Sequence, residues 1–188
     1  MVKTYAYGFP RIGKNREFKK SIEKYWKNGD DKSLNLSLFN IQKDMMDVYS
    51  KHNIDRYPQN EMTGYDKMFD TAIMLGVYNP KDTKEYYDMC RGANALEMTK
   101  WFNTNYHYLV PEISDDIEFK LNWNDRYSKW YFKPLYLMGP YTFLKLSKGS
   151  FDFKTKLKEL TSIYSELIES SNNSYCSFHI DEPAFVMD

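Results

Sequence analysis

The sequence has 188 residues, of which 42% are hydrophobic and 28% charged, enough for the core and the polar surface of one soluble domain. Its 26 basic and 26 acidic residues balance, so bulk charge does not indicate nucleic-acid binding, and no apolar run approaches the roughly 20 residues of a membrane helix. The first residues contain no apolar signal core and the two cysteines lie far apart, so we expect a cytoplasmic protein with reduced thiols.

Apolar residues recur at helical spacing in several segments, and short apolar or alternating runs typical of strands lie between them. The first strand is expected over residues 4–9 and the first helix over 15–27. The other helices are expected over 34–52, 65–75, 82–91 and around 157–167, and the other strands over 54–58, 102–110, 134–138 and 175–180, with a short half-buried strand over 117–123. Strands that alternate with helices predict an α/β fold with a parallel sheet of five main strands.

Five cations surround the start of the first predicted helix. Arg16, Lys19 and Lys20 lie at positions i, i+3 and i+4 and therefore share a helix face, and Arg11 and Lys14 precede them. Cations at this end oppose the helix dipole unless they are paired. One interpretation is a solvated basic face. The other is an anion site, in which backbone N–H groups and cationic side chains together bind carboxylates or phosphates.

Residues 98–112 form an unusual stretch with polar groups on both faces of an expected strand. Asn103, Asn105 and His107 fall on one side because side chains alternate along a strand, and Lys100 lies at its entrance. An edge strand with one solvated face is the ordinary interpretation. A wall that faces a ligand is the functional one.

Six stretches follow one another along the chain, at residues 8–13 (GFPRIG), 16–20 (REFKK), 65–66 (YD), 98–112, 139–144 (GPYTFL) and 180–183 (IDEP). In these stretches the sequence resembles the N-terminal domain of the cobalamin-independent methionine synthase family. The resemblance covers nearly the whole chain, and six ordered matches are more specific than any one of them. One departure is Asn103, which stands where the family usually has aspartate.

The resemblance implies an α/β domain of the TIM-barrel type, in which residues 1–188 are an incomplete barrel of about five of the eight βα units, without the C-terminal zinc domain. It implies methyl transfer from 5-methyltetrahydropteroyltriglutamate to homocysteine, giving methionine, with this segment binding the folate and supplying no catalytic residue. The implied contacts of the folate polyglutamate tail are Arg16, Glu17, Phe18, Lys19 and Lys100. Candidate cleft residues are Arg11, Asn105, His107 and Asp181.

Several alternatives stay open. Lys100 either binds the tail or pairs with Glu97 or Glu112, and Asp181 either lines a cleft or is a structural acid that pairs with Arg11. The chain is either the folate-binding part of the methyltransferase, partnered by the C-terminal barrel or by a second copy, or a non-catalytic folate-binding or structural paralogue. A decarboxylase of the uroporphyrinogen type is a weaker alternative, because the Lys100 stretch argues against it.

The same resemblance implies zinc in the full enzyme, held by residues of the C-terminal domain. Cys176 and His179 are spaced like a metal-binding pair, but residues i and i+3 of a strand point to opposite faces. Cys90 belongs to a different predicted element. We therefore expect no zinc on this chain.

Overall fold

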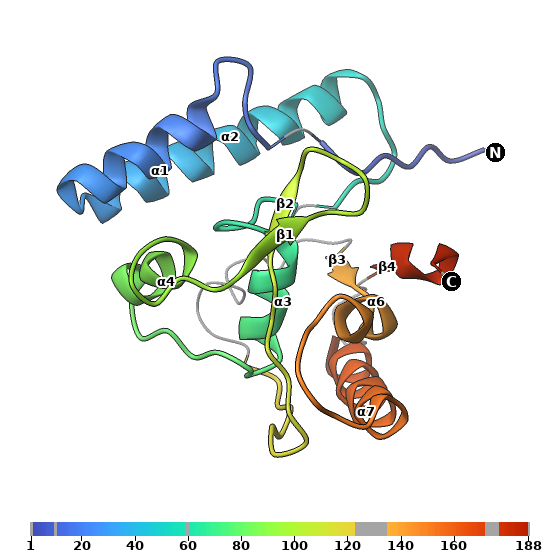
Figure 1. Cartoon of the computed structure of the whole chain (residues 1–188). Coiled ribbons are helices and arrows are strands. Elements are labelled where there is room, and N and C mark those ends of the chain that lie inside the picture. Colours follow the sequence, from blue (N-terminus) through green and yellow to red (C-terminus); the bar gives the residue numbers. More distant parts are fainter. Residues whose placement is uncertain (1, 10, 59–60, 123–134, 172–176, 188) are drawn as a thin grey trace. The chain divides into compact units, whose positions relative to one another are not determined.

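The computed structural model describes residues 2–9, 11–58, 61–122, 135–171 and 177–187 (Figure 1). The chain divides into two compact units. The first consists of Met1–Met62 with Phe132–Tyr136, and the second of Thr63–Tyr131 with Leu137–Asp188. In the part of the chain that the structure describes, no helix is both long and apolar enough to cross a membrane.

Two helices that lie side by side form the body of the first unit (Figure 1). α1 (Glu17–Asn28) ends at Gly29, which has a φ of 66° and donates its N–H to the Tyr25 carbonyl. α2 (Asp31–Lys51) begins directly afterwards because the Asp30 carboxylate accepts the Ser33 N–H. Both helices were expected from apolar spacing, and this cap explains why α2 starts three residues before the predicted boundary. The buried hydrophobic residues of the pair are Phe18, Ile22, Tyr25, Leu34, Ile41, Met45 and Tyr49.

The predicted strands at 4–9 and 54–58 are reduced to one parallel bridge, between Tyr5 and Arg56. The Asp55 carboxylate explains the short pairing, because it takes the Thr4 N–H at 2.7 Å and the Thr4 hydroxyl at 2.9 Å. A buried carboxylate, Glu61, holds the segment further along by accepting the Gly8 N–H and, at 3.1 Å, the Tyr49 hydroxyl. Burial and the Glu61 charge raise the pKa of Tyr5 to about 12.

Two short helices open the second unit, and aspartate caps start both of them. α3 (Lys67–Met74) begins after Asp66, which accepts the Phe69 N–H at 2.9 Å. α4 (Thr83–Cys90) begins after Asp82, which accepts the Glu85 N–H at 2.8 Å. Both helices confirm the segments predicted from the sequence.

The stretch that was expected to be one strand over 102–110 is a hairpin. β1 (Met98–Lys100) pairs antiparallel with β2 (His107–Leu109), and the Trp101 N–H donates to the Tyr106 carbonyl at 2.7 Å to close the connection. The single-strand prediction is wrong because residues 102–106 form the turn. Phe102 has a φ of 49°, and the Thr104 N–H and hydroxyl both donate to the Trp101 carbonyl. Asn and Thr favour such local bonds over a ladder.

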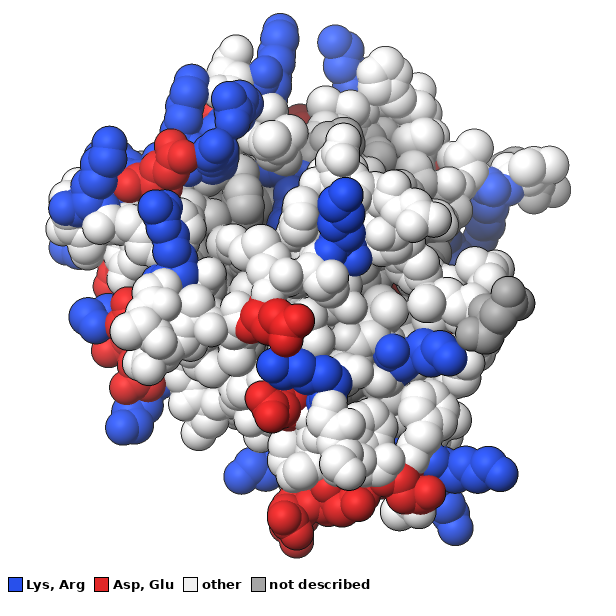
Figure 2. Space-filling model, in the orientation of Figure 1, with Lys and Arg blue, Asp and Glu red and all other residues white. Residues whose placement is uncertain are grey.

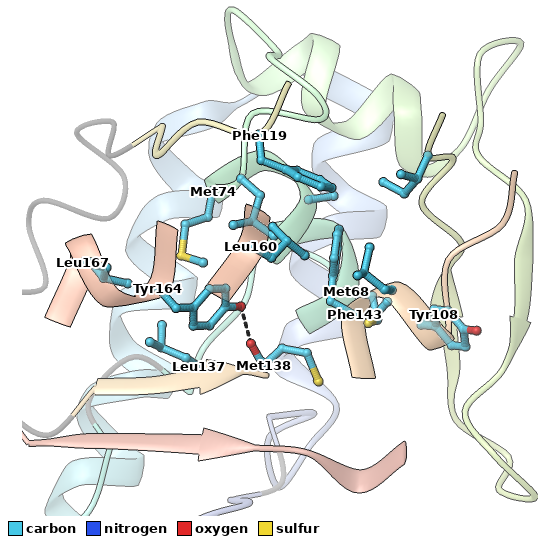
Figure 3. Close-up of a cluster of buried hydrophobic side chains, with 14 of the residues drawn as sticks. Met68, Met74, Tyr108, Phe119, Leu137, Met138, Phe143, Leu160, Tyr164 and Leu167 are labelled. Atoms are coloured by element: carbon cyan, nitrogen blue, oxygen red, sulfur yellow. Dashed lines mark hydrogen bonds between the residues drawn. The ribbon is translucent and has the colours of Figure 1, made fainter. Parts of the chain in front are cut away.

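The second sheet joins β3 (Leu135–Met138) and β4 (Phe178–Asp181), whose arrows run in the same direction in Figure 3. These strands confirm the predicted ones with small shifts, since β4 begins after residue 177 and ends at Asp181, while residues 134 and 175–176 lie outside the described residues. Between them come α6 (Pro140–Lys145) and α7 (Phe153–Ser171), and η2 (Pro183–Val186) follows β4. The strand predicted at 117–123 is absent over its described residues, because Lys120 and Asn122 donate their N–H groups to carbonyls at the end of α3.

The core of the second unit is a cluster of apolar side chains gathered from α3, β2, β3, α6 and α7 (Figure 3). Tyr164 lies inside it and donates its hydroxyl to the Met138 carbonyl, so the buried phenol is satisfied. The fully buried members include Met68, Ala72, Leu75, Ile113, Phe143, Leu144 and Leu160.

Helices and strands together confirm the α/β class. The described strands form two two-stranded sheets, one of them antiparallel, and these sheets do not close into a barrel. The expectation of one parallel sheet is therefore wrong for the hairpin, and a barrel is not confirmed. The physical reason is that two of the five expected main strands make only one bridge and a third folds back on itself.

Candidate functional site

The start of α1 is built around two residues with positive φ. Gly13 has a φ of 78° and accepts the Arg16 N–H at its carbonyl, at 3.1 Å. Arg16 is the residue before the helix, with φ 63° and ψ 36°, and its side chain makes no capping hydrogen bond. Its guanidinium is exposed. The backbone therefore presents an arginine in a conformation that usually favours glycine.

Glu17 fills the anion position at this helix end with its own carboxylate. The carboxylate accepts the Asn15 N–H at 2.8 Å and the Asn15 side-chain amide at 3.0 Å. Hydrogen bonds from its own N–H and from Asn15 hold the pKa of Glu17 below its usual value. An incoming carboxylate would therefore meet cationic side chains before it meets these N–H groups.

Three cations share one surface beside that carboxylate. Arg16, Lys19 and Lys20, together with Glu23, line a small hollow in the surface of α1. The Lys19 ammonium lies 3.6 Å from the Glu23 carboxylate, an exposed pair that contributes about 0–1 kcal/mol. Figure 2 shows Lys and Arg side chains gathered at the upper left, over the place of α1 in Figure 1. The predicted i, i+3, i+4 face is thus formed.

Phe18 is a support for this surface. Its side chain is 9% exposed and belongs to the buried face of α1, so its role as a tail contact stays a prediction. The Arg11 guanidinium lies over the Phe18 ring, 4.9 Å from the ring centre, in a cation–π contact. The structure therefore brings Arg11 to the same helix end as Arg16 and Lys19.

In the second unit, the hairpin collects three of the predicted residues. Lys100 is paired with His107 in the register of β1 and β2, so their side chains share one face, and both are exposed. His107 Nδ1 lies 3.1 Å from the Asn105 carbonyl, while Asn105 itself belongs to the turn. The wall of alternating polar residues that the sequence suggested is therefore not formed, because Asn103 and Asn105 do not lie on a strand.

The expected alternative partners of Lys100 are engaged elsewhere. Lys148 Nζ lies 3.0 Å from the Glu97 carboxylate and 3.8 Å from the Glu112 carboxylate. Bonding to Glu97 raises the pKa of Lys148. Both interpretations of Lys100, tail binding and pairing with one of these carboxylates, therefore stay predictions.

Asp181 ends β4 and is half-buried, and its carbonyl accepts the Gly139 N–H at 2.8 Å. Its pairing with Arg11 stays a prediction, since the two residues belong to different units. Sequence reasoning missed its neighbour Glu182, whose carboxylate accepts the N–H groups of Tyr141 and Thr142 at 3.0 and 2.7 Å. The sequence signal for Glu182 was the Gly-Pro pair at the start of α6. Neither residue has a side chain that can accept the free N–H groups of the first turn, so an acceptor from another segment is required.

A model of the N-terminal domain of the cobalamin-independent synthase family matches residues 3–188, which is nearly the whole chain. The chain belongs to this family. The 5-methyltetrahydropteroyltriglutamate–homocysteine methyltransferase of Thermotoga maritima is 39% identical over 208 positions, which cover 100% of this chain and 28% of the relative. Proteins with the same name from Bacillus velezensis and Bacillus subtilis are 37% identical, over 98% of this chain and 27% of their own length.

This member of the cobalamin-independent synthase family thus spans less than a third of the length of these curated relatives. The Thermotoga maritima alignment has 208 positions and the chain 188 residues, so the relative carries about 20 residues here that the chain lacks.

The family resemblance implies zinc for the full enzyme, but the residues that the structure describes contain no cluster of metal-ligating side chains. Among them, no group of three or more His, Cys, Asp or Glu side chains could hold a metal ion. Cys90 is buried and its thiol donates to the Tyr86 carbonyl at 3.2 Å. Cys176 lies outside the described residues, so the expectation of no zinc on this chain stays a prediction.

Proposed function

We propose that this chain is the folate-binding part of a 5-methyltetrahydropteroyltriglutamate–homocysteine methyltransferase, acting in the cytoplasm as a segment of a (β/α) barrel. Arg16, Lys19 and Lys100 are the proposed contacts of the polyglutamate tail. The observation that carries the proposal is the exposed Arg16, held at φ 63° beside Lys19 and Lys20. The family supplies the substrate, because the relatives are named for the triglutamate form.

The charges of the triglutamate tail and of the proposed site are complementary. A triglutamate tail carries several carboxylates, and charge-assisted hydrogen bonds from Arg and Lys are the strongest that such groups make. Since these cations are exposed, their attraction is screened by salt. Affinity for the tail is therefore expected to fall as ionic strength rises.

This chain would contribute binding, and no catalytic residue. The methyl group passes from folate nitrogen to the homocysteine sulfur, and the zinc that activates that thiol would be held by the C-terminal barrel, the proposed partner, or by the corresponding part of a second copy. Binding of the remote tail lowers the entropic barrier of the reaction by holding the methyl donor in place. Arg11, Asn105, His107 and Asp181 stay candidate cleft residues on this proposal.

Calorimetric titration with the triglutamate and monoglutamate forms of methyltetrahydrofolate tests the tail site. Arg16→Ala, Lys19→Ala and Lys100→Ala are each expected to weaken triglutamate binding about tenfold, or about 1.4 kcal/mol, and monoglutamate binding much less. Lys27→Ala is the matched control, because Lys27 lies in the last turn of α1, about 16 Å along the helix from Arg16. Equal losses for both ligands would remove the tail assignment.

A further inference from the structure

Three features at the start of α1 are not used by tail binding itself. Gly13 has a positive φ, Arg16 is left-handed, and the Glu17 carboxylate turns back onto Asn15. The family resemblance groups Glu17 with the tail contacts. In the structure its two oxygens instead accept the backbone and side-chain N–H groups of Asn15.

We propose that Glu17 is a positioning residue of the tail site, which holds Arg16 in its binding conformation without touching the tail. The inference rests on the proposed function, because it takes Arg16 as a tail contact. Glu17 lies directly after Arg16 and is bonded to the residue directly before it. The φ and ψ of Arg16 are therefore fixed from both sides.

Gly13 provides the space for this arrangement. A Cβ on Gly13 would overlap the Glu17 carboxylate, and the φ of 78° disfavours any side chain there. The loop is closed further by the Arg16 N–H on the Gly13 carbonyl, at 3.1 Å, and by the Lys20 N–H on the Arg16 carbonyl, at 3.0 Å. A strained backbone conformation persists only where its surroundings fix it in this way.

The same carboxylate also selects how the tail is bound. Because Glu17 already accepts local N–H groups at the helix start, tail carboxylates are left to the side-chain cations. A negative charge beside the site would by itself repel the tail. Glu17 therefore has two opposite effects, and the positioning effect is the one that its removal tests.

Two substitutions of Glu17 separate these effects in triglutamate titrations of the full chain. Glu17→Ala is expected to weaken binding about five- to tenfold, because Arg16 is no longer held in place. Glu17→Gln is expected to stay within about twofold of the natural chain, since its amide oxygen can still accept the Asn15 N–H and its NH₂ group can donate to the Asn15 side-chain oxygen once that amide turns over. Monoglutamate binding is expected to change by less than about twofold in both variants.

Gly13→Ala is a second route to the same loss. It is expected to weaken triglutamate binding about as much as Glu17→Ala, and the double variant is expected to be less affected than the sum of the two, because the loop is disrupted only once. Circular dichroism verifies that α1 is retained. If Glu17→Ala does not fold, Asn15→Ala takes its place as the test. This variant removes only the side-chain bond to Glu17 and is expected to weaken triglutamate binding by a smaller factor.

Two results would overturn the inference. Tighter binding by Glu17→Ala would mean that Glu17 only repels the tail, and unchanged binding would mean that it gives no net positioning of Arg16. Equal losses in Glu17→Gln and Glu17→Ala would mean that the charge itself is required, as in a direct ligand contact. If instead Arg16→Ala and Lys19→Ala leave triglutamate binding unchanged, the proposed function fails, whatever the Glu17 variants do.

Discussion

Arg16 combines backbone strain with an exposed charge. A residue with a β-carbon in the left-handed region is destabilised by roughly 1–2 kcal/mol, and the Arg16 side chain does not offset this by capping α1. Such an outlier in the backbone is a better pointer to function than the charge alone, because a merely solvated arginine needs no special conformation.

Replacing Arg16 by glycine separates strain from charge. Glycine accepts a positive φ but has a more flexible unfolded chain, so Arg16→Gly is expected to raise the free energy of unfolding by up to about 1 kcal/mol. The same variant loses the guanidinium and is expected to bind the triglutamate about tenfold more weakly. Urea unfolding and calorimetric titration measure the two effects. Arg16→Ala keeps the strain and is the control; a glycine variant less stable than the alanine one would contradict the argument.

For single residues, the sequence was enough to find the cations and the helix face that they share, but not the backbone and the carboxylate beside them. Arg16, Lys19 and Lys20 follow from helical spacing, which depends on neighbours in the chain alone. The direction of the Glu17 carboxylate depends on the φ of Gly13 and Arg16, which no residue pattern predicts.

Among the described elements, the five predicted helices are formed and α6 was not predicted, whereas three of the five predicted main strands are not formed as expected. The helices are specified locally, by apolar spacing and by the caps Asp30, Asp66 and Asp82. A strand depends on a partner that is distant in the sequence, so alternation alone could not show that residues 102–106 turn back. The polar alternation of Asn103 to Asn105 was a turn signal that resembled a solvated strand.

Asp66 connects α3 with β2, so its replacement tests how much one side chain contributes to the packing of two elements. Its two carboxylate oxygens accept the Phe69 N–H at the start of α3 and, at 3.0 Å, the Leu109 N–H of β2. The side chain is 4% exposed. Asp66→Ala is expected to lower the free energy of unfolding by about 2–4 kcal/mol, because it removes a cap and leaves a buried strand N–H without its acceptor. Urea unfolding followed by circular dichroism measures the loss.

The capping contribution can be subtracted with Asp82, which caps α4 and is exposed. Asp82→Ala is expected to cost about 1 kcal/mol, the usual value for a cap alone. Asp66→Asn is expected to fall between the two, since its one carbonyl oxygen can replace only one of the two acceptors. Equal losses for Asp66→Ala and Asp82→Ala would show that the bond to β2 contributes nothing.

In both units of the molecule, ionised carboxylates accept hydrogen bonds from backbone N–H groups. In the first unit, hydrogen bonds from Thr4 hold the pKa of Asp55 below its usual value, and bonds from its own N–H and Asn15 do the same for Glu17. In the second unit, bonds from Thr155 lower the pKa of Asp152 at the start of α7. These carboxylates make stability depend on pH throughout the chain.

The sign of that dependence follows from the direction of the shifts. A carboxyl with a lowered folded pKa stabilises the protein above its unfolded value and loses this effect as pH falls through the folded one. Bonding to carboxylates raises the pKa of Lys84 and Lys148, and burial raises that of Tyr5 to about 12, so stability is lost again in strong alkali. Thermal unfolding is therefore expected to have a constant midpoint from about pH 5 to pH 9 and a falling one below about pH 4. The Asp55→Asn and Glu17→Gln double variant should lose part of the acid dependence; a midpoint that rises on acidification would contradict the assignment of these bonds.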